Sequence, residues 1–496
     1  MGVATWLLMA AVVVLLWAYS KWRHSYWSSK GVASPPPLPV VGHMHSFITG
    51  QRWIYVDEHY RKLRNHKMWG LYEFFNPVLM IADPELLKHI MVKDFEHFVD
   101  RRVFGEQKGS VMTEMLTNKL GEEWKDLRAV MTPTFSSGKM RSMFHLICEK
   151  ADDMVSFSLK KAGKNMPVDM KDMFGRFTMD TIASCAFGIE CNSLSESKPV
   201  FAEKAETFFN FRGIKLLKMT LMLTLPKIYN LLGFKADPPE VEFFAKLSKE
   251  NMAAREKGKK RGDFLDLLLE ARATENDVRP GKKVFGEHTL VAQSVLFLVA
   301  GYDTTASTLA FSAFLMAKYP QHQYRLRQEL QELIKEYGSV TYQGIMEAKF
   351  LDAILMETLR LCPPGTIGER KCTKQYRIPG TDVILKPGDL IQIPLWSIQH
   401  DPHYWPAAEE FRPERFLPEN RGNIQSFTHM PFGMGPRNCI AMRFALMEAK
   451  VALAQLILAA DLKLAPGHEN LEFQNSPFLM RPKAGVMLLL TPLKNE

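Results

Sequence analysis

The first twenty residues limit what the rest of the chain can be, because they carry no charged side chain. Residues 5–19 read TWLLMAAVVVLLWAY. Twenty helical residues span ~30 Å, roughly the hydrocarbon thickness of a bilayer. Lys21, Arg23 and Lys30 follow this run, and no Lys or Arg precedes it. We therefore predict a transmembrane signal anchor over residues 1–20, with the rest of the chain on the cytoplasmic side.

A cleaved secretory signal peptide is the alternative. Such a peptide has a shorter apolar run that ends at a cleavage site of small residues. Here the run is long, and basic residues follow it. The chain also contains no N-x-S/T sequon, a motif that large secreted proteins often carry. These observations favour a retained anchor.

A proline-rich segment follows the anchor and reads SPPPLPVVG over residues 34–42. Clustered prolines favour polyproline II, which would form a stiff rod between membrane and body. An ordinary linker is the alternative, and both place a boundary near residue 35. Since no second linker or repeat interrupts the remaining chain, we predict a basic, proline-rich hinge over residues 21–42 and one catalytic domain over residues 43–496.

The composition is that of a globular protein, with 46% apolar and 24% charged residues. Six cysteines without a C-x-x-C pair favour neither a disulfide scaffold nor a structural zinc site. The net charge is +9, from 63 Lys and Arg against 54 Asp and Glu. Because no nucleic-acid-binding motif is present, we predict no nucleic-acid partner, and membrane lipid or an acidic protein explains the basic excess.

The body is predicted to be mainly α with small β-sheets. Apolar residues at helical spacing predict helices over residues 288–319, 321–337, 345–361 and 444–460. Strands are predicted on either side of a turn at residues 386–389 and over residues 484–490. Residues 211–233 mix apolar bulk with lysines, so they form either a buried helix pair or a surface segment that dips into the membrane.

The most specific motif is PFGMGPRNCIA, over residues 431–441. Its glycines and prolines predict a loop that closely approaches another group. Arg437 and the helix that follows are suited to stabilising a Cys439 thiolate. A lone cysteine is more often a small buried apolar residue, but the complete pattern F-x-x-G-x-R-x-C-x-[GA] is present.

This loop, with Phe432, Gly435, Arg437 and Cys439, resembles the haem-binding loop of the cytochrome P450 monooxygenases. The resemblance covers essentially the whole chain. It implies the cytochrome P450 fold, haem b (iron protoporphyrin IX) as cofactor, and Cys439 as the axial thiolate ligand of the haem iron. The family usually has glycine two residues after the cysteine, where this chain has Ala441.

Two segments match the family's structural triad. Glu357 and Arg360 occur as E-x-x-R on one helix face, a pairing that alone usually forms only a surface ion pair. Arg415 lies in the later segment FRPERF. The resemblance implies that Glu357, Arg360 and Arg415 form a buried triad that fixes the segment shaping the cysteine loop.

The sequence AGYDTT interrupts the long apolar helix with residues that disfavour a helix interior. We expect a local kink that opens a polar slot. The match to the family motif [AG]-G-x-[DE]-T-[TS] implies that this part of the helix crosses the distal haem face. There the Thr304 alcohol would contact dioxygen and its water chain, while Asp303 helps to relay protons. We predict Asp303 and Thr304 as the catalytic residues.

Several basic residues are predicted to hold the haem propionates. Trp124 and Arg128 form the family's W-x-x-x-R motif on one helix face, although surface packing is the alternative for the motif in isolation. A guanidinium fork suits a carboxylate. The position of three further arginines in the chain makes them candidates: Arg101, Arg370 and Arg437. Phe432 completes the predicted cofactor-binding residues.

The chain lacks a G-x-G-x-x-G fingerprint, so its electrons must come from another protein. The resemblance implies NADPH–cytochrome P450 reductase, with cytochrome b5 as a second candidate, and a place in the endoplasmic reticulum membrane. The sequences of these motifs are similar to those of the animal microsomal group with drug- and insecticide-metabolising members. We therefore predict a monooxygenase that uses O₂ to hydroxylate lipophilic molecules, either xenobiotics or endogenous lipids and steroids.

The predicted substrate pocket is apolar. It is formed by residues 101–121, 203–230, 297–304, 364–370 and 477–482.

Two other functions stay open. A haem-thiolate isomerase or dehydratase would act on peroxides without O₂ or a reductase, but such relatives typically lose the acid–alcohol pair that Asp303 and Thr304 preserve here. A non-catalytic haem protein that binds lipophilic molecules would leave that pair without a purpose. Activity with a reductase distinguishes both from a monooxygenase.

Overall fold

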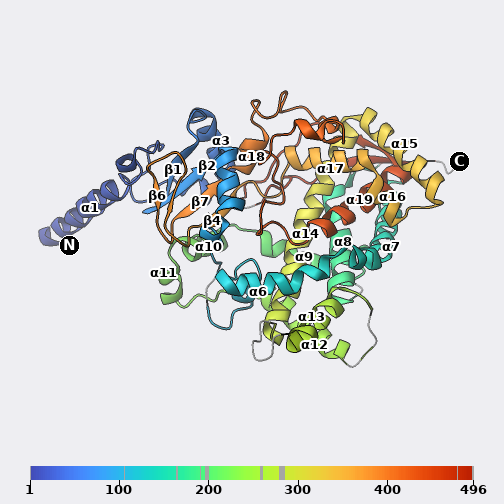
Figure 1. The fold of residues 1–496 in the computed structure, drawn as a ribbon, viewed down its shortest axis with the longest axis horizontal. Helices are drawn as coiled ribbons and strands as arrows, with labels where there is room; N and C mark the ends of the chain where they lie inside the picture. The colour runs from blue at the N-terminus through green and yellow to red at the C-terminus, as the bar shows by residue number, and fades with distance from the viewer. Residues whose placement is uncertain are drawn as a thin grey trace.

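The computed structural model is mainly α with small β-sheets, which confirms the predicted fold class (Figure 1). It describes residues 2–104, 107–163, 166–189, 191–195, 200–256, 258, 261–278, 285–476 and 479–493. Residues 105–106 and 477–478, which belong to two predicted pocket segments, lie outside the described residues.

The α-helices are α1 (Val3–Arg23), α2 (His45–Ile48), α3 (Arg52–Lys62), α4 (Pro84–Lys88), α5 (Val111–Glu114), α6 (Gly121–Met131), α7 (Ser137–Ala162), α8 (Met170–Ile182), α9 (Val200–Phe209), α10 (Ile214–Thr224), α11 (Pro226–Leu231), α12 (Pro239–Glu256), α13 (Phe264–Val278), α14 (Glu287–Lys318), α15 (Pro320–Tyr337), α16 (Tyr342–Glu347), α17 (Lys349–Leu361), α18 (Leu395–Gln399) and α19 (Met442–Ala459). The strands are β1 (Met68–Glu73), β2 (Asn76–Ile81), β3 (Val168–Asp169), β4 (Gly368–Lys371), β5 (Tyr376–Arg377), β6 (Ile384–Leu385), β7 (Leu390–Ile393), β8 (Ala460–Leu464) and β9 (Met487–Pro492).

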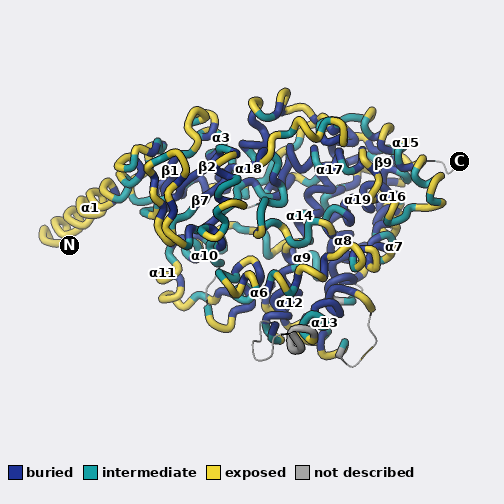
Figure 2. Tube along the Cα trace, in the orientation of Figure 1, coloured by how far each residue is buried: buried dark blue, intermediate teal, exposed yellow. Residues whose placement is uncertain are grey.

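The core has a large helical part and a smaller sheet part. The helical part surrounds α14 and includes α7, α8, α17 and α19. The sheet part covers the sheet of strand order β1-β2-β7-β4, in which only β2 and β7 run parallel. Figure 2 shows the dark, buried helices around α14 and the exposed α1, which projects from the sheet end.

Helix α14 is a core helix although its composition would allow it to cross a membrane. It has a mean hydropathy of 1.2 but is mostly buried, whereas α1 belongs to a segment with a mean hydropathy of 2.0 that is almost entirely exposed. Helix α14 runs through AGYDTT without a break, so the local kink expected there stays a prediction. Thr304 and Thr308 donate to the carbonyls of Ala300 and Thr304, one turn earlier, at 2.7 and 2.9 Å.

The single helix predicted over residues 345–361 is two helices, α16 and α17. Ala348 separates them in an extended conformation. The Glu329 carboxylate of α15 accepts the N–H groups of Phe350 and Leu351 at 2.7 and 3.0 Å and so satisfies donors in the first turn of α17. A cap supplied by another helix leaves no local signal in the sequence.

The strands around the turn at residues 386–389 do not pair with each other. Strand β6 pairs with β5, whereas β7 pairs with β2 and β4, so the turn leads from one sheet to the next. The predicted strand over residues 484–490 begins slightly later, as β9, and pairs with β3 and β8. The sequence analysis missed β1 and β2, whose apolar residues flank a tight connection at Phe74 and Phe75.

The predicted hinge over residues 21–42 is not a free rod, because the structure packs it on the body. Trp27 is buried, and its indole and backbone N–H groups donate to the Leu71 carbonyl and the Tyr72 hydroxyl at 2.9 Å each. Gly70 lies against the Trp27 ring so closely that a methyl group there would overlap it. The chain therefore packs on the body directly after α1, and the domain boundary near residue 35 stays a prediction.

The segment over residues 211–233 lies at the surface as α10 and α11. Its apolar residues point largely outward, including Ile214, Leu217 and Leu231, which is 85% exposed. The buried helix pair is therefore wrong for this segment, which lies at the surface, and its contact with the membrane stays a prediction.

The Gly70→Ala substitution should destabilise the junction between α1 and the body. The added methyl group must displace Trp27, and overpacking of this kind costs about 1–3 kcal/mol. We expect a lower midpoint of thermal unfolding by circular dichroism and faster proteolysis within residues 24–42. Gly138→Ala is the matched control, because a methyl group at Gly138 meets only open space. Equal stability of the two variants would contradict the docking of Trp27.

Candidate active site

The cysteine loop is held in shape by its own backbone hydrogen bonds and by close contact with the segment that contains Met91. The Cys439 N–H donates to the Phe432 carbonyl at 2.8 Å. Gly435 has a φ of +72°, and a methyl group there would overlap the Met91 carbonyl. Only glycine fits this position. Ala441 has a φ of −92°, a value that alanine adopts freely, so the loop does not require the family's usual glycine at this position.

Cys439 has the surroundings of a ligand rather than of a packing residue. Cys439 is exposed although protein atoms surround it on most sides, and it lies three residues before α19. Burial by protein atoms raises the pKa of its thiol above the usual value, and the Ala441 N–H and the guanidinium groups of Arg128 and Arg101 offset this only in part. The loop therefore offers its sulfur to a partner and surrounds it with groups that favour the thiolate.

Four arginines from separate segments converge beside this loop: Arg101, Arg128 of α6, Arg370 of β4 and Arg437. Burial lowers the pKa of Arg437 to about 9, and Arg101 and Arg128 add to that effect. Burial also lowers the pKa of Arg370 far below its usual range, with contributions from Arg101 and Arg437. The cluster is therefore short of negative charge.

The hydrogen bonds of these arginines go to backbone and amide oxygens. Arg101 donates to the Arg437 carbonyl at 2.7 Å, and Arg128 donates to both oxygens of Asn438 at 2.8 and 2.9 Å. In the described part of the chain none of the four forms an ion pair with a carboxylate. The buried Nε atoms of Arg370 and Arg437 have no hydrogen-bond partner there either. This arrangement fits the two carboxylates of haem, because buried cations normally require paired anions.

Trp124 is a packing residue for this cluster. It is buried on α6, and the Arg437 guanidinium lies over its ring at 4.5 Å. The structure thus brings together the predicted cofactor-binding residues of the loop, α6 and β4. Asn438, which orients Arg128, was not predicted.

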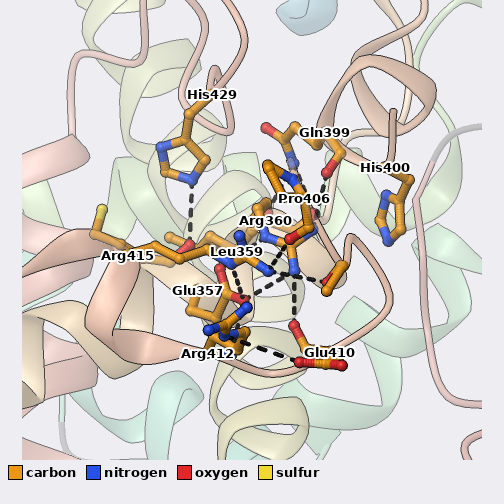
Figure 3. A network of polar contacts seen from close by, with 12 residues as sticks. Glu357, Leu359, Arg360, Gln399, His400, Pro406, Glu410, Arg412, Arg415 and His429 are labelled. Carbon is orange, nitrogen blue, oxygen red and sulfur yellow. Dashed lines mark hydrogen bonds and ion pairs between the residues drawn. The ribbon is translucent and has the colours of Figure 1, made fainter. Parts of the chain in front are cut away.

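Glu357 of α17 pairs with both Arg360 and Arg415 (Figure 3). Arg360 donates to both Glu357 oxygens at 2.7 and 2.8 Å, and both side chains are completely buried. The Arg415 Nε lies 3.4 Å from Glu357, and its terminal nitrogen donates to the carbonyls of Pro406 and Ala407.

The same network reaches the start of the cysteine loop. Glu357 also accepts the Arg412 backbone N–H at 2.9 Å. Arg360 donates to the Gln399 carbonyl (Figure 3). The Gln399 side chain accepts the N–H of Met430 at 3.1 Å. Met430 directly precedes the loop. The ion pairs on α17 are therefore connected, through one glutamine, to the segment that carries Cys439.

Asp303 and Thr304 point to different surroundings. Asp303 is completely buried, and its Oδ1 lies 2.8 Å from both Lys171 of α8 and Arg481. Burial would raise the pKa of Asp303, but these two cations outweigh it and hold the pKa below its usual range. Asp303 is therefore ionised at neutral pH. Lys171 and Arg481 were not predicted, because nothing local in the sequence links them to α14.

Thr304 lies on a stripe of incompletely buried residues along a helix that is otherwise almost entirely buried. The stripe consists of Phe297, Ala300, Gly301 and Thr304, at the i, i+3, i+4 and i+7 spacing of one helix face. A core helix that leaves one face uncovered at its centre has room there for a ligand. The Thr304 hydroxyl and the Asp303 carboxylate form no direct hydrogen bond in the described structure.

A second buried ion network stands behind the arginine cluster. Arg102, next to Arg101, pairs with Glu73 at 2.5 Å and with Glu369 at 2.6 Å. Glu369 in turn precedes Arg370. Arg101 and Arg370, which are the neighbours of Arg102 and Glu369 in the chain, are therefore held in place by this ion network. The sequence analysis missed this network, since Glu73 lies on an unpredicted strand.

The Glu357→Ala substitution should abolish haem retention. It leaves two buried guanidinium groups without their carboxylate, a change that costs about 3–5 kcal/mol. We expect purified protein with little or no haem per polypeptide, measured by the pyridine haemochromogen spectrum. Asp153→Ala removes an exposed ion pair with Lys150 at the same i, i+3 spacing and should leave the haem content unchanged. A Glu357→Ala protein with full haem content would contradict the role of the triad.

Comparison with known proteins agrees with this geometry. The sequence model of the Cytochrome P450 family matches residues 32–490. Cytochrome P450 3A41 of Mus musculus is 38% identical over 459 residues, which cover 91% of this chain and 90% of that protein. Cytochrome P450 9e2 of Blattella germanica is 37% identical over 486 residues, which cover 91% of each chain.

A third relative extends over almost the whole length. Cytochrome P450 3A31 of Mesocricetus auratus is 34% identical over 498 aligned positions, which cover 99% of this chain and 97% of that protein. The loop of Cys439, the buried arginines and the helical core all lie within the matched region. The chain therefore belongs to the cytochrome P450 family of haem-thiolate monooxygenases.

Proposed function

We propose that this protein is a membrane-anchored monooxygenase that receives electrons from a separate NADPH–cytochrome P450 reductase and hydroxylates lipophilic small molecules. The observation that carries the proposal is the Cys439 loop beside four arginines, two of them buried, that lack carboxylate partners among the described residues. Within the family this arrangement belongs to monooxygenases, and the motif with Asp303 and Thr304 is complete.

We assign haem b as the cofactor. Cys439 would be its axial ligand, Phe432 would lie in the loop beneath it, and the arginine cluster would bind its propionates. When bound, haem supplies the iron at which O₂ is reduced and one oxygen atom is transferred to the substrate. The arginines would balance the propionate charge, so the residues present suit this group better than a neutral one.

Proton delivery is the task assigned to α14. The proposed reaction consumes substrate, O₂, NADPH and one proton, and it yields hydroxylated product, water and NADP⁺. Asp303 is ionised and held by Lys171, which is 14% exposed and thus reaches toward solvent. A proton would pass from this pair to water beside the partly exposed Thr304 hydroxyl, because Asp303 and Thr304 are not bonded directly.

The electron donor has to be a separate protein, since the chain carries no dinucleotide-binding fingerprint. NADPH–cytochrome P450 reductase is the donor we assign, with cytochrome b5 as a second donor. The net charge of +9 is suited to an acidic partner. The domain arrangement we propose is one anchor followed directly by one catalytic body.

The substrate class and location rest on two features. The relatives named above include members of the 3A and 9 groups, and a lipophilic xenobiotic or endogenous lipid suits the apolar residues near α14.

The exposed apolar residues of α10 and α11 lie toward the same end of the molecule as α1 (Figure 1). Asn76, the first residue of β2, donates a hydrogen bond to the Thr224 carbonyl of α10. We propose a single span in the endoplasmic reticulum membrane, with the body on the cytoplasmic side and α10–α11 against the lipid.

The Thr304→Ala substitution should uncouple NADPH consumption from product formation. Loss of the hydroxyl removes the group that holds protons and water at the exposed face of α14, and a loss of ~1.4 kcal/mol changes the partition about tenfold. We expect about tenfold less product per NADPH and a matching rise in released hydrogen peroxide, measured with reductase and a lipophilic probe substrate.

Two variants complete this test. Thr304→Ser keeps the hydroxyl and should restore coupling. Thr308→Ala removes a buried hydroxyl that makes the same kind of bond one turn away, and it should leave coupling unchanged. Unchanged coupling in Thr304→Ala would contradict the assigned role. Conversion of peroxides without O₂ or reductase would instead identify an isomerase or dehydratase.

A further inference from the structure

The segment that carries Arg101 lies antiparallel to strand β4, which carries Arg370. Asp100 and Lys371 form a β-bridge, and the Lys371 N–H donates to the Asp100 carbonyl at 2.8 Å. Continuing this register by one residue brings Arg101 opposite Arg370. Both guanidinium groups donate to backbone carbonyls of the cysteine loop, at 2.7 and 3.5 Å respectively. The two like charges therefore share the face of this strand pair that is turned to the loop.

The two opposed arginines repel each other. Like charges directly opposite on neighbouring extended segments destabilise their pairing. In the part of the chain that the structure describes, neither Arg101 nor Arg370 forms an ion pair with a carboxylate. Arg370 is also buried, where solvent ions screen the repulsion only weakly. Keeping both cations beside the loop therefore requires an opposing interaction elsewhere on the strand pair.

That interaction lies on the opposite face, where the same register brings Arg102 opposite Glu369. Neighbouring residues of an extended chain point to opposite faces, so this pair is turned away from the two cations. Arg102 donates to the two Glu369 carboxylate oxygens at 3.2 and 2.6 Å, in the bidentate geometry that a guanidinium fork favours. A further nitrogen of Arg102 donates to Glu73 on β1 at 2.5 Å. One arginine therefore ties its own segment to two strands.

Two further side chains complete the network on this face. Gln392 of β7 donates to Glu73 at 3.0 Å and to Glu369 at 3.2 Å. Arg52 of α3 donates to the Gln392 side-chain oxygen at 3.0 Å and lies 3.6 Å from Glu73. The network thus joins two guanidinium groups with two carboxylates and carries no net charge. A network that is satisfied in this way fixes one geometry, whereas the face turned to the loop keeps its charge available.

We propose that Arg102 is a positioning residue whose bond to Glu369 clamps the strand pair and holds the two cations of the opposite face together against their repulsion. Arg101 and Arg370 then form a ready face for a dianionic group. In this protein that group is the pair of haem propionates, so the role rests on the proposed function. Preorganisation strengthens binding because fewer groups have to be ordered when the anion arrives.

Haem transfer from the ferric protein to an excess of apomyoglobin tests this role. Arg102→Gln breaks the clamp, and Glu369→Gln weakens it while Arg102 keeps its pair with Glu73. We expect each variant to release haem about tenfold faster than the unmodified protein, and the double variant to release it no faster than the faster single one, because both remove the same interaction. Arg61→Gln is the matched control. It removes an exposed ion pair with Asp57 and should leave the rate unchanged.

Thermal unfolding followed by circular dichroism distinguishes a clamp against repulsion from an ordinary structural ion pair. Arg370→Gln removes one of the two like charges, so the clamp has less to oppose. Arg102→Gln should lower the unfolding midpoint of the unmodified protein, and it should lower that of the Arg370→Gln protein by at most about half as much. Should Arg370→Gln fail to fold, Arg101→Gln removes the other like charge and serves the same comparison.

Two results would overturn the proposal. One is an equal loss of stability in both backgrounds, and the other is an Arg102→Gln protein that releases haem at the unmodified rate. If the unmodified protein takes up no haem, the proposed function fails, whereas the unfolding midpoints still decide the role of Arg102.

Discussion

The four arginines beside the Cys439 loop carry positive charge that no carboxylate of the described residues pairs with, and much of the structure keeps that charge in place. The guanidinium groups of Arg101, Arg128, Arg370 and Arg437 lie beside the Cys439 loop and depress one another's pKa values. Burying them without an anion would be strongly unfavourable. A bound dianionic group resolves this imbalance, so folding and cofactor binding are expected to be coupled.

The buried ion networks around the site act as its frame. Glu357 holds Arg360 and the Arg412 backbone, and Gln399 extends this network to the start of the cysteine loop. Behind the arginine cluster, Arg102 joins Glu73 and Glu369 on two strands of one sheet. These networks join segments far apart in the sequence. Each of them would be costly to leave half-satisfied, which favours one arrangement of the loop over its alternatives.

The anchor is part of the same body. Trp27 fills the space above Gly70 in β1, so the direction in which α1 leaves the body is set by packing rather than by a flexible hinge. The apolar surface of α10 and α11 then has a defined position relative to α1.

Features written in contiguous residues could be predicted from the sequence. The cysteine loop, the long buried helix and the mainly α fold follow from local pattern, and the confirmed family membership follows from the loop. Features that depend on distant partners could not. The cap that Glu329 places on α17 and the ion pairs of Asp303 with Lys171 and Arg481 arise only when separate elements meet. The docking of Trp27 could not be predicted for the same reason, because Gly70 gives no sign in the sequence that an indole covers it.

The central claim is that Cys439 is the thiolate ligand of a haem held by the arginine cluster. The carbon monoxide difference spectrum of the dithionite-reduced, detergent-solubilised protein tests this most directly. Our account predicts the strongly red-shifted Soret band of thiolate-ligated haem. A band at the shorter wavelength of histidine or protonated-thiol ligation, in freshly prepared and folded protein, would contradict the assignment of Cys439.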